Sequence, residues 1–262
     1  NYGSTVVIGF SSVLAQDNWI ALILAAIIAV PVFLMYGRIL KLYPEKDFFD
    51  IAGILLGKVG GKIVSALFVV YSLLLAALVL RNFAESTEIS FLEKTPKLPI
   101  MICTVLTSIY LARSGMRTVG KWSVVMIVPV IFVTVWTLLG SIKQMRIGQI
   151  LPVMDHPFKT IANVAFETFS FPFAETVLFL CLGGALSRDN KHYKMFLLAL
   201  TYTVLTFLAI FFRNITLLGR EMMRDTFFPS FVAVRILEMG DFFARVEGSV
   251  SSNFLLAGVA KI

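Results

Sequence analysis

The stretch that decides the fold runs from Ala165 to Leu180 and reads AFETFSFPFAETVLFL. It is apolar enough for a lipid bilayer, yet Pro172 lies in its middle and Glu175 follows just past it. Proline removes a backbone donor and clashes with the preceding helical turn, so we expect the helix to break at Pro172. Backbone groups freed inside a bilayer need partners, so such a break is tolerated only within protein or beside a wet cavity. The stretch therefore predicts a discontinuous membrane helix beside a small-molecule site.

The whole chain has the composition of a polytopic helical membrane protein. Of its 262 residues, 58% are hydrophobic and 15% are charged, and the mean hydropathy is +0.87. Apolar runs long enough to span a bilayer recur along the chain, whereas the alternation of a transmembrane barrel is absent. The net charge of +7 comes from basic residues between the apolar runs. This favours loops on an anionic membrane leaflet over a nucleic-acid surface.

The sequence offers no pattern typical of an enzyme or a metalloprotein. Cys103 and Cys181 both lie in apolar runs, which favours packing over a disulfide or a metal site. His156 lies in a polar connection, where we expect it on the surface. No Ser–His–acid set, phosphate loop or metal-ligand cluster is recognised in the sequence. We therefore expect no catalytic activity, no cofactor and no metal.

The apolar runs predict membrane helices joined by short polar connections. Residues 48–62 are too short to span and predict an interfacial helix ended by Gly57, Gly60 and Gly61. Residues 213–248 predict an extramembrane amphipathic connection. We expect residues 1–262 to form one transmembrane domain that is truncated at both ends. Spans are expected at residues 19–42, 63–83, 122–142, 161–186 and 195–212, with a short one at 99–112 and a last one from residue 249.

A second candidate opening lies at the start of the chain, where Gly3, Ser4 and Thr5 stand in a row. These residues predict either a locally open membrane helix or a small-residue packing face. If this segment is the first helix, Pro172 lies in the sixth, the corresponding position in the second of two five-helix halves. The pairing predicts a LeuT-like inverted-repeat (5+5) core, covered here from part of helix 1 to part of helix 8. Half-helix ends suit a ligand that carries both a carboxylate and an ammonium group.

Glu175 is the candidate ligand-binding residue with the strongest physical argument. A carboxylate within a membrane span costs about 2.5–3.5 kcal/mol on insertion scales and is functional by default. We interpret it as a contact for a ligand ammonium group or as a proton carrier. The structural alternative is that it bonds the loose amides of the broken helix.

Five neighbouring candidates would complete the binding site around Glu175, opposite Gly3 to Thr5. Phe171, Pro172 and Phe173 are expected to form one wall, although plain packing is the alternative for the two rings. Tyr71 lies near the middle of a predicted span, where its hydroxyl needs a partner, either in the site or on a neighbouring backbone. Leu75 follows it on the same helix face and is expected to line the third side.

The motif SFPFAE at residues 170–175 resembles the SFPFGE motif of the spore germination permease family, the B subunits of nutrient germinant receptors. Further similarities follow in matching order along the chain. They are Gly-Ser-Thr in the first helix, Leu-Pro-Val before the sixth, Arg245 and Glu247 before the eighth, and the closing Lys-Ile. Two positions depart from the pattern. Ala174 stands where the family usually has Gly, which narrows backbone access to the pocket, and Thr5 stands where a second Gly is common.

This resemblance implies the ten-helix inverted-repeat core of the amino acid–polyamine–organocation superfamily. It implies a multi-pass protein of the bacterial spore inner membrane that senses small nutrients, often amino acids. It also implies two partners, a larger membrane A subunit and a C lipoprotein. In related transporters helices one and eight hold a coupling sodium ion, and the ammonium group of Lys261 would replace that ion. The alternative is that the last span is shifted and Lys261 reaches water.

The resemblance favours a receptor subunit, in which nutrient binding shifts a conformational equilibrium that partner subunits detect. An active secondary amino-acid transporter and a ligand-gated ion-conducting pore need the same broken helices and remain alternatives. The sequence does not name the nutrient, the coupling ion or the oligomeric state.

Overall fold

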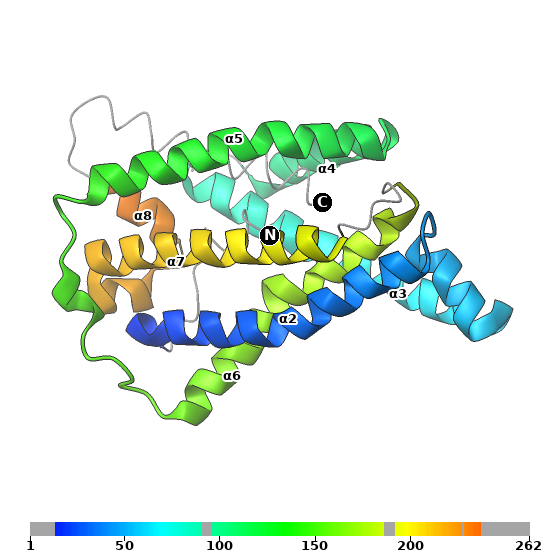
Figure 1. Cartoon of the computed structure of the whole chain (residues 1–262). Coiled ribbons are helices and arrows are strands. Elements are labelled where there is room, and N and C mark those ends of the chain that lie inside the picture. The colour runs from blue at the N-terminus through cyan, green and yellow to red at the C-terminus, as the bar shows by residue number, and fades with distance from the viewer. Residues whose placement is uncertain (1–13, 91–95, 186–191, 227, 237–262) are drawn as a thin grey trace.

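The computed structural model of the chain describes residues 14–90, 96–185, 192–226 and 228–236 (Figure 1). Within these ranges the regular elements are helices, and no strand is present. The long helices are α2 (Asn18–Leu42), α3 (Phe48–Ser90), α4 (Lys97–Arg113), α5 (Met116–Ser141), α6 (Phe158–Thr168) and α7 (His192–Asp225). The shorter elements are η1 (Ala15–Asp17), η2 (Ile147–Ile150), η3 (Phe169–Phe173), η4 (Ala174–Ala185) and α8 (Pro229–Arg235).

Five segments of the described chain are long and apolar enough to cross a membrane. They are Ala15–Leu42, Phe48–Glu88, Thr118–Ser141, Phe158–Cys181 and His192–Asp225. The expected polytopic helical membrane protein is thus confirmed. α4 is the exception among the expected spans, because its 17 residues extend only about 25 Å at 1.5 Å per residue. That is short of a hydrocarbon core of about 30 Å.

α3 consists of two arms that meet at Gly57, where the backbone leaves the helical region with φ 70° and ψ −178°. The positive φ favours glycine, so the expected end of the short helix at Gly57 is confirmed. Gly60 and Gly61 instead lie inside the second arm, which differs from the prediction. A Cβ atom on Gly61 would lie only 2.8 Å from the Cα of Gly53, so the two arms are in close contact beside the turn.

Two helices extend beyond their predicted ends. α3 continues past the expected end at residue 83 to Ser90, and Arg81 bonds Glu85 one turn later at 3.0 Å. α7 continues past Phe212 to Asp225, with a break at Gly219 (φ 74°). Arg213, Asn214 and Thr216, which were expected in the extramembrane connection, are buried and hydrogen-bonded within the protein, as described below.

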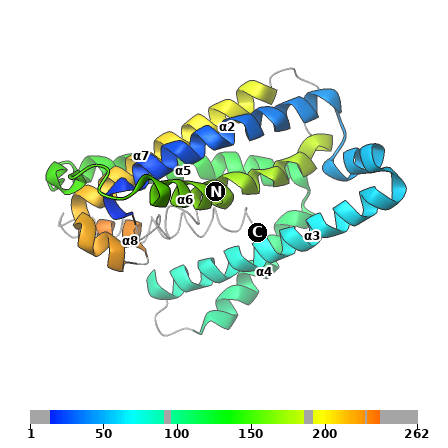
Figure 2. The ribbon, with the colours of Figure 1, turned by 90° about the horizontal axis from the view of Figure 1, so that it is seen from below.

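The broken segment that follows α6 packs against α2, and α2 in turn lies beside α7 along its length (Figure 1). A single hydrophobic core joins the three, whereas α3 and α4 pack against each other to one side (Figure 2). The core includes Leu22, Ala25, Ala29 and Phe33 of α2, Phe173 and Leu180 of the broken segment, and Phe196, Leu200, Phe207 and Ile210 of α7.

Gly183 provides a test of how closely the end of η4 approaches the turn after α2. A Cβ atom there would clash with the backbone oxygen of Lys46 and lie 3.0 Å from the Cδ2 atom of Leu40. We expect Gly183→Ala to destabilise the protein by about 1–3 kcal/mol, because backbone must move to make room. The midpoint of thermal unfolding in detergent measures this loss. Gly184→Ala is the matched control, since its nearest neighbour would lie 3.6 Å away; equal midpoints for the two variants would contradict the close approach.

Candidate functional site

The helix that begins at Phe158 breaks where the sequence predicts. α6 ends at Thr168, a single wide turn (η3) follows, and the chain continues as the tighter helix η4. Within the wide turn Phe171 has φ −139° and ψ 109°, which is an extended conformation. Because Pro172 cannot donate a backbone hydrogen bond and its ring excludes a helical neighbour, the break is placed by the proline itself. The prediction of a discontinuous helix at Pro172 is confirmed.

Glu175 lies in the first turn after the break and is only 3% exposed. Its neighbours in the chain are also inside the protein: Pro172 and Phe173 are buried, and Phe171 is half-buried. The Thr176 hydroxyl donates to the backbone oxygen of Phe173 at 2.6 Å, within the first turn after the break. The acid is therefore inside the protein and not on the lipid-facing surface.

Two tyrosines lie on helices that neighbour the broken segment. Tyr71 is on α3, which packs against η4, and it is 39% exposed. Tyr36 is on α2, which packs against η3 and η4, and it is buried. Leu75, one turn after Tyr71, is 8% exposed. The expected roles of Tyr71 and Leu75 in ligand binding stay predictions.

Tyr36 is a candidate that the sequence reasoning missed. It is 5% exposed and its ring packs against Phe33 and Phe196, with centroids 6.2 Å away in each case. The signal was present in the sequence, because a tyrosine within an apolar run needs a partner for its hydroxyl. The same argument made Tyr71 a candidate and holds equally for Tyr36.

Four sequence candidates fall outside the described residues: Gly3, Ser4, Thr5 and Lys261. Their expected roles therefore stay predictions. Among the described residues no group of three or more His, Cys, Asp or Glu side chains forms a metal-ligating cluster.

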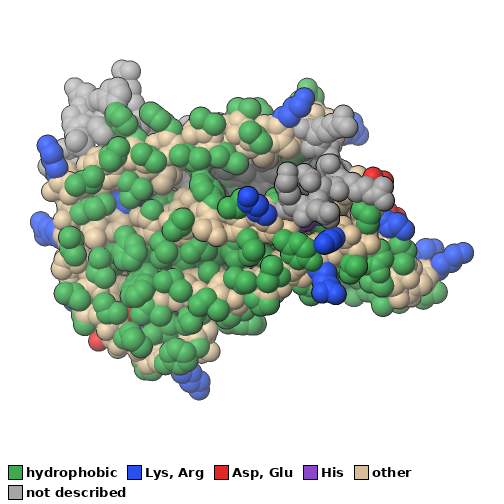
Figure 3. Space-filling model, in the orientation of Figure 1, with side chains coloured by type: hydrophobic (Ala, Val, Ile, Leu, Met, Phe, Trp, Pro, Cys, Tyr) green, Lys and Arg blue, Asp and Glu red, His purple; other side chains and the backbone are tan. Residues whose placement is uncertain are grey.

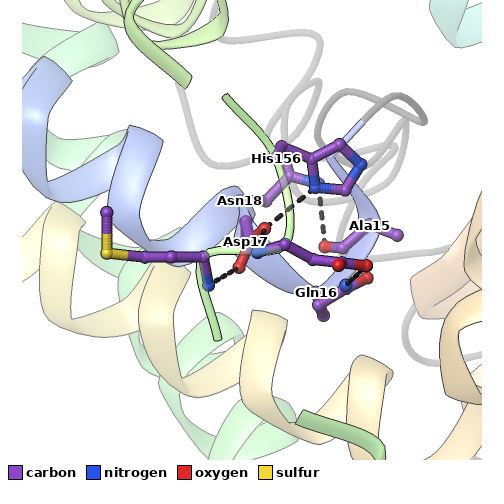
Figure 4. Close-up of polar contacts among 7 residues, drawn as sticks. Ala15, Gln16, Asp17, Asn18 and His156 are labelled. Carbon is purple, nitrogen blue, oxygen red and sulfur yellow. Dashed lines mark hydrogen bonds and ion pairs between the residues drawn. The ribbon is translucent and has the colours of Figure 1, made fainter. Parts of the chain in front are cut away.

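A second polar cluster surrounds Asp17, immediately before α2 (Figure 4). Its carboxylate is fully buried and accepts hydrogen bonds from the backbone N–H groups of Met154 and Asp155, at 2.8 and 3.0 Å. The Nδ1 atom of His156 lies 2.9 Å from the same carboxylate. Gln16 adds a bond from Nε2 to Asp155 at 3.3 Å. These contacts tie the loop that leads into α6 to the start of α2.

His156 is therefore not the surface residue that the sequence suggested, because its side chain is only 17% exposed. The prediction was wrong because its partner Asp17 lies 139 positions away in the chain. The polar triplet Gln16, Asp17 and Asn18 at the head of an apolar span was the available signal.

A third buried polar cluster centres on Arg213 of α7, which is 3% exposed. Its guanidinium donates to the Thr137 hydroxyl of α5 at 2.8 Å and to the Oδ1 atom of Asn214 at 2.7 and 3.1 Å. Asn214 in turn donates to the Ser230 hydroxyl of α8 at 3.0 Å. The cluster links three helices near the end of α7 and explains why that helix does not stop at Phe212.

Comparison with known proteins places these features in a family. Residues 1–262 match the spore permease family model, described as spore germination protein. Spore germination protein KB of Bacillus subtilis (strain 168) is 24% identical over 269 residues, covering 99% of this chain and 70% of that protein. The putative spore germination protein YfkT of the same organism is 22% identical over 249 residues, covering 94% of this chain and 67% of that protein. Spore germination protein YndE of the same organism is 25% identical over 169 residues, covering 63% of this chain and 46% of that protein.

Because the family model matches the chain along its whole length, the protein belongs to the spore germination permease family, as the SFPFAE motif indicated.

Proposed function

We propose that this chain is the nutrient-binding subunit of a spore germination receptor, built like a transporter and signalling to partner subunits. The observation that carries the proposal is Glu175, a buried carboxyl group placed just after a proline break inside a membrane segment. A break of this kind is tolerated where protein or a wet cavity supplies hydrogen-bond partners for the backbone. In this proposal it leaves free backbone N–H groups beside the carboxyl group of Glu175. The names of the relatives support a role in germination.

The ligand class follows from the chemistry of the site. A carboxylate suits an ammonium group, and the exposed amides of a half-helix suit a carboxylate, so an amino acid matches both. In this proposal Phe171, Pro172 and Phe173 form the wall beside Glu175, and Tyr71 and Leu75 lie across from it. Gly3, Ser4 and Thr5 supply the opposite side.

The finer architecture belongs to the same proposal. The chain adopts a LeuT-like inverted-repeat core of the amino acid–polyamine–organocation superfamily, with the ammonium group of Lys261 in place of a coupling ion. It works in the spore inner membrane with an A subunit and a C lipoprotein. An active amino-acid transporter is the second candidate, because the broken helix would serve alternating access equally well.

The proposal is tested by measuring binding and uptake with the same protein. The purified protein is screened against single amino acids by the shift of its thermal unfolding midpoint, and it is reconstituted in vesicles with each labelled hit. We expect one amino acid or a small group to raise the midpoint, with no accumulation inside the vesicles. Accumulation driven by a sodium or proton gradient would support the transporter instead. If no amino acid raises the midpoint, the proposed ligand class is wrong.

A further inference from the structure

A second cavity lies away from the residues proposed to bind the nutrient. It has a volume of about 240 Å³ and lies between the end of α2, both arms of α3 and η4. Neither Glu175 nor Tyr71 lines it. The side chains that form it are apolar, among them Ile39, Phe48, Ala52, Leu55, Val64 and Leu180.

The two arms of α3 hold the cavity open. They touch beside the turn at Gly57, where Gly53 and Gly61 pack backbone to backbone. Further from the turn Phe48 stacks on Phe68 with ring centroids 4.3 Å apart. Between these two contacts the arms leave a space. The cavity therefore results from the small residues Gly53 and Gly61 at one contact and the large rings of Phe48 and Phe68 at the other.

The lining decides what kind of molecule fits. Water needs two or more polar partners to be held in a cavity, so an apolar lining favours an apolar ligand. The lining of this partly open cavity offers no polar surface. An apolar ligand is therefore expected, and in a membrane protein the most abundant source of one is a lipid acyl chain.

The position of the cavity places it at the membrane boundary. The first arm of α3 exposes Ile54, Leu55 and Leu56 at 50%, 62% and 54%. Leu55 and Leu56 also line the cavity, so the cavity is open on this side of the protein. A helix too short to span that exposes apolar side chains is typical of the interface between headgroups and acyl chains. The cavity behind it is thus at the depth where an acyl chain begins.

The basic residues around the cavity favour a lipid with an anionic headgroup. Lys41, Lys46, Lys58 and Lys62 are all exposed, and each lies two positions from a residue that lines the cavity. Basic side chains gather at this end of the molecule (Figure 3). Residues 38–62 contain five basic residues, which are these four lysines and Arg38. The same range contains three acidic residues, Glu45, Asp47 and Asp50. Asp47 accepts the backbone N–H of Asp50 at 2.9 Å, so one acid caps the start of α3.

We propose that this cavity is a binding site for an anionic phospholipid. One acyl chain lies between the two arms of α3, and the phosphate contacts the lysines that flank the cavity. Basic residues beside membrane helices bind anionic headgroups in this way. The site is independent of the nutrient site and would exist whether the protein is a receptor or a transporter.

Photocrosslinking in vesicles tests the proposal. The full-length protein is reconstituted in phosphatidylcholine containing a trace of phosphatidylglycerol with a photoreactive group in the acyl chain, and labelled peptides are identified by mass spectrometry. We expect peptides covering residues 48–64 to be labelled several-fold more than those covering the exposed face of α5. The same photoreactive chain on phosphatidylcholine is expected to label residues 48–64 several-fold less.

Two variants separate the acyl chain from the headgroup. Ala52→Phe fills the cavity and is expected to reduce labelling of residues 48–64 several-fold, whereas Ala77→Phe on the exposed face of the same helix is the matched control. Lys58→Gln combined with Lys62→Gln removes two charges without filling the cavity and should abolish the preference for phosphatidylglycerol. Equal labelling by the two lipids, or unchanged labelling in Ala52→Phe, would overturn the proposal. Nutrient binding by the same preparations shows that a negative result concerns the lipid site alone.

Discussion

Glu175→Gln is expected to weaken nutrient binding by about 30-fold or more while the protein remains folded. In the proposed site the carboxylate pairs with a ligand ammonium group inside the protein. Removing one partner of a buried, hydrogen-bonded charge pair typically costs about 2–5 kcal/mol, and about 1.4 kcal/mol corresponds to a factor of ten. Glutamine keeps the size of the side chain and changes only its charge and its acceptor capacity. The dissociation constant of the amino acid identified by thermal shift is the quantity to measure.

The control for this result is Glu167→Gln, the same substitution on the exposed face of α6 before the break. It should leave the dissociation constant unchanged. The structural alternative for Glu175 predicts a different pattern, in which the variant unfolds at a lower temperature and binds the ligand normally once folded. An unchanged dissociation constant together with a lower midpoint would therefore assign Glu175 to holding the broken helix.

The features that the sequence predicted are those that depend on local chemistry. Pro172 cannot donate a hydrogen bond to the preceding helical turn and lies at the break, and Gly57 ends the first arm of α3 because glycine adopts its positive φ without strain. The burial of Glu175 followed from the cost of exposing a carboxylate to lipid. Each argument needs only a few neighbouring residues, which is why each could be made without a structure.

The features that the sequence did not predict depend on partners far along the chain. Arg213 was assigned to an extramembrane connection, because one of the groups that accept hydrogen bonds from its guanidinium is the Thr137 hydroxyl, which lies 76 positions earlier. His156 was assigned to the surface because its partner Asp17 lies 139 positions away. Charged residues at the ends of apolar runs were therefore interpreted as loop residues, although the fold pairs them inside the protein.

Asp17→Ala is expected to destabilise the protein by about 3–5 kcal/mol, the largest stability effect predicted for the described residues. The substitution leaves the backbone N–H groups of Met154 and Asp155, and the ring of His156, without the buried acceptor that they share. Each hydrogen bond to a charged group contributes about 1.5–3 kcal/mol, and leaving a donor buried without a partner costs more than the bond alone. The midpoint of thermal unfolding should fall by roughly 10 °C or more.

The same variant should also loosen the loop that leads into α6, because Asp17 is what ties that loop to α2. Hydrogen exchange at the amides of Met154 and Asp155 is therefore expected to accelerate before any global unfolding. Asp50→Ala is the matched control, since the Asp50 side chain is exposed on the first arm of α3. Because the loop continues directly into the helix that breaks at Pro172, nutrient affinity in Asp17→Ala reports whether the loop holds the site in position. Normal exchange at both amides would show that the loop is held by its other contacts and that Asp17 does not act as its anchor.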